Sequence, residues 1–139
     1  MRDVPWCRTR VAPMRRLALG ALLLTLGCDD DPLAPFQPEI GNATDSFQFQ
    51  VTALRNVTIV REYDWQHTGT VANVNQATAL GGGTARLVIR DAGGTEVYRR
   101  DLTANGTFQT STGAAGRWRI RVELADASGA VNFRVQRRQ

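Results

Sequence analysis

The sequence predicts an all-β protein: an antiparallel, jelly-roll-like β-sandwich of about eight strands, which follows an N-terminal signal helix and a disordered tether. Three observations lead to this prediction. From residue 46 on, apolar side chains recur at every second residue, as they do in half-buried strands. The residues between these segments are glycine, asparagine and aspartate, which favour tight turns. No segment beyond residue 27 has the apolar periodicity of a helix.

The first 27 residues have the order of features of an export signal. Two adjacent arginines precede a leucine-rich run over residues 17–27, which ends in a small glycine. A membrane-spanning helix needs about 20 apolar residues, so this run is too short for a permanent anchor. Residues 1–13 fit no part of such a signal, whereas translation from Met14 would give a compact one. We therefore expect a removable signal peptide at residues 1–27, with Met14 as an alternative start.

Cys28 follows the apolar run directly. The tetrapeptide Thr25-Leu26-Gly27-Cys28 resembles the lipobox of bacterial lipoproteins, although Thr25 replaces the aliphatic residue more common in that pattern. The resemblance implies that the Cys28 thiol is acylated and that Cys28 becomes the first residue of the mature chain. The other reading of Cys28, a disulfide, lacks a partner, because Cys7 lies in the segment to be removed.

Residues 28–45 are expected to be the lipidated cysteine and a proline-rich acidic tether. Residues 29–45 contain three prolines and five acids and show little periodicity. A flexible chain of this length reaches on the order of 20–25 Å. The protein would then be exported and held by its lipid to a bacterial membrane, inner or outer, with a single domain at residues 46–139.

Eight segments of this domain are expected to form the strands, because they are rich in valine, threonine and aromatic residues. These segments are residues 46–53, 57–65, 69–78, 85–90, 96–102, 107–111, 117–124 and 130–136. Turn chemistry joins several of them, as in Asp-Ala-Gly-Gly-Thr-Glu at 91–96, Ala-Asn-Gly at 104–106 and Ala-Asp-Ala-Ser-Gly at 125–129.

The alternation is clearest in the first segment and in the last hairpin. Phe47, Phe49 and Val51 face one way and the glutamines between them the other. In residues 117–124 the apolar side chains, beginning with Trp118, alternate with three arginines and a glutamate. One face of each strand is therefore expected to line the core and the other to meet water.

Two stretches carry a family resemblance. "LVIRDAGGTEVY" and "GAAGRWRIRVELADASGAVNFRV", residues 87–98 and 113–135, resemble the small β-sandwich modules of bacterial pre-peptidase C-terminal domains. The shared features are a strand, an Asp-x-x-Gly turn, and a Gly-x-Trp-x-Ile strand before a final hairpin. The resemblance covers about half of the mature chain and implies an accessory module, not a catalyst.

The basic charge of the chain belongs to the signal. Residues 1–27 contain five arginines and one acid, which accounts for the formal net charge of +4, and the rest has 12 arginines and 12 acids. A nucleic-acid partner therefore loses its main support.

The residues for familiar catalytic and metal sites are scarce. The mature chain has one histidine and one cysteine, so a Cys/His metal site lacks ligands. It has no Gly-x-Ser-x-Gly nucleophile motif, and the glycines at 81–83 lack the helix that a phosphate-binding loop requires. We expect no cofactor, no metal and no enzymatic activity.

The first candidate binding surface is aromatic. Tyr63, Trp65 and His67 share one face of a strand, and aromatic faces can stack on sugar rings. The alternative is that Tyr63 and Trp65 belong to the core, with their polar tips satisfied at its edge.

The second candidate surface is the arginine face formed by Arg117, Arg119, Arg121 and Arg134, expected on adjacent strands. Guanidinium groups bind carboxylate and phosphate through paired hydrogen bonds, so this face could meet an acidic partner. The alternative is a solvated face whose arginines pair across strands with acids such as Glu123, Asp101 and Glu96.

Together these features predict a non-catalytic binding or protein-interaction module at the cell envelope, anchored to the membrane through Cys28, with an envelope protein or a glycan as its partner. Two other functions stay open, a carbohydrate-binding domain and a structural subunit of an envelope complex.

Overall fold

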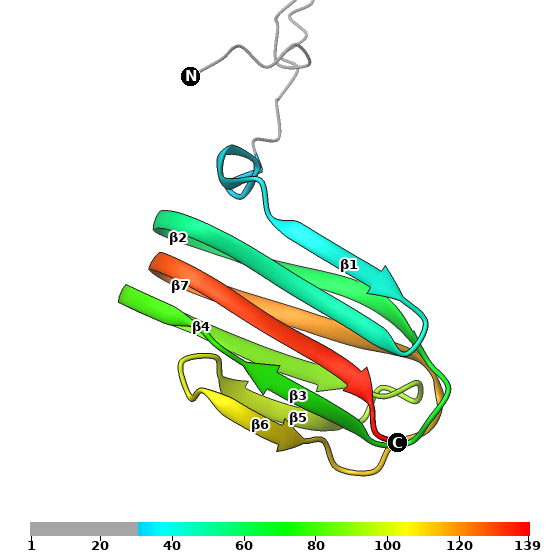
Figure 1. The fold of residues 1–139 in the computed structure, drawn as a ribbon. Helices are drawn as coiled ribbons and strands as arrows, with labels where there is room; N and C mark the ends of the chain where they lie inside the picture. The colour runs from blue at the N-terminus through cyan, green and yellow to red at the C-terminus, as the bar shows by residue number, and fades with distance from the viewer. Residues whose placement is uncertain (1–30) are drawn as a thin grey trace, which may run out of the picture. The chain divides into compact units, whose positions relative to one another are not determined.

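The structure, a computed structural model, describes residues 31–139. The expected signal peptide, the start at Met14, the lipidated Cys28 and the first residues of the tether lie outside the described residues. A short 3-10 helix precedes seven strands (Figure 1). The elements are η2 (Ala34–Phe36), β1 (Glu39–Ala43), β2 (Ser46–His67), β3 (Ala72–Gln76), β4 (Ala79–Arg90), β5 (Glu96–Asp101), β6 (Gly106–Gln109) and β7 (Gly116–Arg137). Over residues 31–139, no helix has the length and apolar character to cross a membrane.

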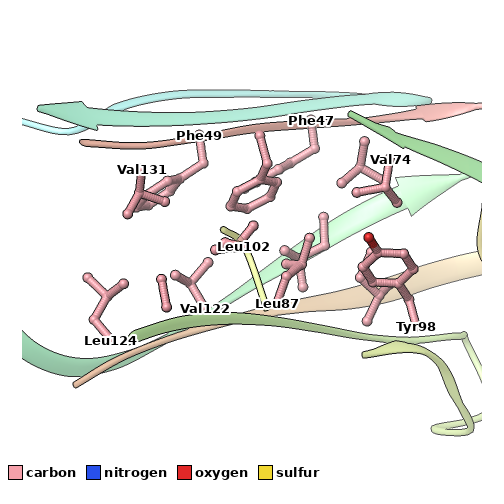
Figure 2. Packing of buried hydrophobic residues seen from close by; sticks show 14 of the residues in the cluster. Phe47, Phe49, Val74, Leu87, Tyr98, Leu102, Val122, Leu124 and Val131 are labelled. Atoms are coloured by element: carbon pink, nitrogen blue, oxygen red, sulfur yellow. The ribbon is translucent and has the colours of Figure 1, made fainter. Parts of the chain in front are cut away.

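The all-β prediction is confirmed: every strand pairs antiparallel, in two facing layers (Figures 1 and 2). In the first layer the order is β1, the start of β2, the end of β7, β3 and β6. In the second layer it is the end of β2, the start of β7, β4 and β5. The two long strands therefore belong to both layers.

Two pairs of expected strands are joined into single long strands. Segments 46–53 and 57–65 are one strand, β2, and segments 117–124 and 130–136 are one strand, β7. The predicted turn at 125–129 is an irregular part of β7 and not the end of a hairpin. These breaks in alternation look like turns in the sequence because both turns and bulges need the same small residues.

The bend between the layers lies where the regular pairing is interrupted. The register shifts between Val51 and Ile59 in β2 and between Leu80 and Thr84 in β4. Positive φ angles gather in the same region, at Ala53, Asn56, Gly83, Asp126 and Gly129. Bulges of this kind increase the twist of a strand and turn it. They allow β2, β4 and β7 to change direction together.

Two glycines at the bend are required by close backbone approach. Gly83 has a φ of 75°, and a Cβ there would overlap the carbonyl of Asp126. Gly129 has a φ of 127°, and a Cβ there would overlap the carbonyl oxygen of Ala79. The run of glycines at 81–83 is thus part of the bend inside β4.

The core lies between the two layers (Figure 2). Phe47 and Phe49 from β2 stack with Phe133 from β7, at ring-centroid distances of 6.0 and 5.4 Å. Facing them from the second layer are Leu87, Ile89, Ile120, Val122 and Leu124. Each fully buried side chain of this size contributes about 1.5–3 kcal/mol. The predicted inward alternation of Phe47, Phe49 and Val51, and of the apolar residues in 117–124 and 130–136, is confirmed.

The expected tether is wrong from Leu33 onward. Leu33 is only 1% exposed, and Phe36 in η2 packs against the core. β1 then pairs with the start of β2, from Glu39 opposite Gln50 to Ala43 opposite Ser46. All five residues of β1 are exposed, so the strand has no apolar alternation by which it could be recognised. Its backbone pairing places it in the sheet.

We predict that Gly83→Ala lowers the free energy of unfolding by at least about 2 kcal/mol, because the added Cβ meets backbone at a positive φ. Gly81→Ala is the matched control, since a Cβ there meets nothing within 4 Å. It should change stability by less than about 1 kcal/mol. Urea denaturation of the two variants measures the difference, and equal losses would contradict the close approach at the bend.

Candidate functional site

The aromatic candidate surface faces the core. Tyr63, Trp65 and His67 do share one face of β2, as predicted, but Trp65 and His67 are fully buried. Tyr63 is half-buried and packs 5.3 Å from Phe47. The prediction of a sugar-stacking surface is therefore wrong, because this face of β2 is the one that Phe47 and Phe49 also use.

The polar edges of the two tryptophans are satisfied by backbone. The indole N–H of Trp65 donates to the carbonyl of Ala43 at 3.0 Å, and that of Trp118 donates to Ala114 at 2.7 Å. The two residues are opposite each other on β2 and β7, with their rings edge-to-face at 6.0 Å. This is the core arrangement that the alternative reading predicted.

His67 completes the cluster. Its ring stacks on Trp65 at 4.7 Å and meets Trp118 edge-on at 4.3 Å. Burial lowers the pKa of His67; the nearby Asp45 carboxylate partly opposes this shift, and the Arg137 charge adds to it. The histidine is therefore held neutral inside the folded protein.

Asp45 anchors the same end of the sandwich. Its carboxylate accepts hydrogen bonds from the backbone N–H and the hydroxyl of Thr68, both at 2.7 Å, and lies 3.8 Å from Arg137. Burial acts to raise the pKa of Asp45, but these hydrogen bonds and the Arg137 charge outweigh it and lower the pKa. The turn between β1 and β2 is thus tied to the residue that follows β2.

The arginine face is only partly assembled. Arg117, Arg119 and Arg121 project outward from the second layer on β7. Arg134 lies on the outer face of the first layer, beside Gln48, whose side-chain oxygen it contacts at 3.3 Å. The expected cluster of four is wrong in this respect, because β7 bends from one layer to the other between Arg121 and Arg134.

Acids neutralise much of this face. Arg121 contacts Glu123 at 2.7 Å and Glu62 at 3.2 Å, and Arg119 lies 3.6 Å from Asp64. The same face carries the pairs Arg86 with Asp101 at 3.7 Å and Arg99 with Glu96 at 2.9 Å. These side chains are partly or largely solvated, so each such pair adds little to the stability of the fold. Most of this surface is therefore a solvated face whose arginines pair with nearby acids, as the alternative prediction stated.

One end of the face is hollowed. A depression of about 620 Å³ is lined by Asp64, Gln66, Arg90, residues 91–94, Arg117 and Arg119. Sequence reasoning missed Arg90 and the role of Asp91. The signal was present in the turn "DAGGT", in which an aspartate before two glycines is suited to accept hydrogen bonds from the turn backbone.

Asp91 builds the wall of this depression. Its carboxylate accepts backbone hydrogen bonds from Gly93 at 2.9 Å, Thr95 at 2.8 Å and Ala114 at 2.8 Å. These hydrogen bonds, with that of Ala114 the strongest, lower the pKa of Asp91. The ionised side chain therefore holds the β4–β5 turn against the segment that precedes β7. Within residues 31–139, no three histidine, cysteine or acidic side chains come together as metal ligands.

We predict that Trp65→Ala lowers the free energy of unfolding by about 3–5 kcal/mol, because a fully buried indole is removed. Gln66→Ala, an exposed change at the next residue, should stay within about 0.5 kcal/mol. Chemical denaturation monitored by circular dichroism measures both. A small loss for Trp65→Ala would restore the aromatic surface hypothesis.

A second prediction concerns pH. Because the pKa of His67 is lowered in the folded state, the unfolded chain binds a proton below about pH 6.5 while the folded chain does not. Stability should therefore fall as the pH is lowered through about 6.5, and the fall should be smaller in His67→Phe. The carboxyl groups of Asp45, Asp91 and Glu96 have lowered pKa values and lose their contribution only at more acidic pH. Identical pH dependence of the two denaturation midpoints would contradict the burial of His67.

Comparison with known proteins identifies no relative in sequence. No model of a known protein family matches the chain, and no curated protein matches it. Among solved structures, the chain is similar to one in the structure of infectious bursal disease virus strain Gt, at 16% identity and a TM-score of 0.27. The match covers 89% of this chain and 35% of the viral chain, so this chain spans about a third of the length of that protein.

Proposed function

We propose that this protein is an exported lipoprotein, anchored to a bacterial membrane through a lipid on Cys28, whose β-sandwich is a non-catalytic binding or protein-interaction module of the cell envelope. One observation carries the proposal. Residues 32–139 form a compact unit, and their buried apolar cluster begins at Leu33. Cleavage before Cys28, the position that the lipobox-like tetrapeptide indicates, would therefore remove no residue of this cluster.

The position of Leu33 shortens the expected tether. Three residues, 29–31, separate Cys28 from Pro32, and four extended residues reach at most about 14 Å. A lipid on Cys28 would therefore keep the sandwich close to the bilayer, and its partner would be another molecule at that surface.

A non-catalytic role agrees with the placement of His67, the only histidine of the chain. Its ring is enclosed by two tryptophans and is fully buried, so it has no access to a substrate as a general base. The competing proposal of a carbohydrate-binding domain is not supported by this strand face, because Trp65 is buried next to His67 and offers no surface for a sugar ring.

We predict that Cys28→Ser moves the protein from the membrane fraction to the soluble fraction and abolishes incorporation of labelled fatty acid. The reason is that serine lacks the thiol on which acylation depends. Cys7→Ser is the matched control and should leave both measurements unchanged, because residue 7 lies upstream of the expected cut. Membrane retention or lipid labelling of Cys28→Ser would refute the anchor.

A further inference from the structure

We propose that the depression between Arg90, Arg117 and the Gly93–Gly94 turn binds an oxyanion group, a carboxylate or a phosphate, carried by a small polar ligand. The inference rests on the proposed role as a binding module and specifies the chemistry that this module recognises. It concerns only the end of the arginine face where the depression lies.

The first argument is a like-charge pair. Arg90 on β4 is directly opposite Arg119 on β7. Like charges opposite each other on adjacent strands destabilise a sheet. Other arginines of this face have an acid as a cross-strand neighbour, as in Arg86 beside Glu123 and Arg121 beside Glu62, and Arg90 has Glu96 on its other side. An anion lying between the two arginines would remove the repulsion.

The second argument is the distribution of counter-charges. Arg119 has Asp64 at 3.6 Å and Glu62 at 3.9 Å. Arg90 is opposite Glu96 on β5, but that carboxylate is bound by Arg99 at 2.9 Å, and the hydrogen bond of Arg90 goes to the backbone carbonyl of Gly94, at 3.4 Å. Within the described part of the chain, the guanidinium of Arg117 has no hydrogen bond or ion pair, and its neighbour on β2 is the uncharged Gln66. Arg117 and Arg90 therefore keep donors available for a ligand.

The third argument is the shape of the wall. Gly93 and Gly94 carry no side chains, and a Cβ on Gly94 would meet nothing within 4 Å. The turn therefore leaves open space in front of the arginines. The Asp91 carboxylate next to it is occupied by three backbone N–H groups, so its main role is to fix this turn. The lining itself holds three arginines and two acids, Asp64 and Asp91, and the neighbouring Glu96 is already paired with Arg99.

The lining indicates the class of ligand. The depression has a volume of about 620 Å³, which suits a small molecule. Its lining contains no aromatic residue on which a neutral sugar ring could stack. Arginine binds carboxylate and phosphate groups through two parallel N–H donors, which gives both charge and geometry. An acidic sugar and a phosphorylated compound share this chemistry.

The test is an NMR titration of the full chain in a non-ionic detergent with glucuronate, inorganic phosphate and, as the neutral control, glucose. We expect saturable shifts at the amides of Gly93, Gly94 and Arg117 with at least one anion and none with glucose. The anion that binds more tightly distinguishes a carboxylated ligand from a phosphorylated one.

Two charge-matched variants locate the site. Arg117→Gln should weaken anion binding about tenfold or more, because it removes charged hydrogen bonds to the ligand. Arg134→Gln removes the same charge from the other layer and should change the affinity less than twofold. Unchanged melting of both variants checks that they are folded.

Three results would overturn the proposal: no saturation by either anion up to about 0.1 M without other added salt, equal weakening by both variants, or equal binding of glucose. Because the titration does not depend on lipidation, it can fail while Cys28→Ser still releases the protein from the membrane. The reverse result would remove the anchor and leave the oxyanion site standing.

Discussion

The structure depends on the pairing of two long strands, β2 and β7, through a shared bend. They pair from Ser46 opposite Gln136 to His67 opposite Gly116, and the bulges in β2 fall where β7 also turns. Because the two strands bend together, the pair supplies adjacent strands to both layers. The remaining strands extend the layers on either side: β1, β3 and β6 in the first, β4 and β5 in the second. The core is the space enclosed between the two halves of this pair (Figure 2).

Further contacts close the sandwich at its sides. Leu33 and Phe36 of the N-terminal segment cover the core beside β2. On the side of β5 and β6, Arg100 lies 3.9 Å over the ring of Phe108, and the Tyr98 hydroxyl donates to Gln76 at 2.5 Å. These contacts join β5 in the second layer to β6 and β3 in the first. Residues 31–139 contain no cysteine, so these contacts cover the core without a disulfide. An apolar segment covers one side, and a cation–π contact and a hydrogen bond cover the other.

The same strand pairing decides which side chains can meet a partner. Residues of one parity on β2 and β7 enter the core, which removes Trp65 and His67 from the surface. Residues of the other parity form a surface on which acids of β2 meet arginines of β7. Toward the β4–β5 turn this pairing is less complete, because Arg117 has the uncharged Gln66 as its neighbour on β2 and Arg90 is opposite Arg119. The proposed oxyanion site therefore lies at the end of the β2–β7 pair, where Arg117 is not matched by an acid on the neighbouring strand.

The all-β class, the inward parity of Phe47 and Trp118, and the outward parity of the arginines can all be read from the sequence, because alternation along a strand is a local property. The sequence also carries the whole basis for the proposed anchor at Cys28. Other features depend on contacts between distant segments. Only pairing could place the exposed residues 39–43 in a sheet, join two predicted strands across each bend, and separate Arg134 from Arg117. The depression at Arg90 likewise depends on residues distant in sequence, and periodicity within one strand contains no information about its neighbours.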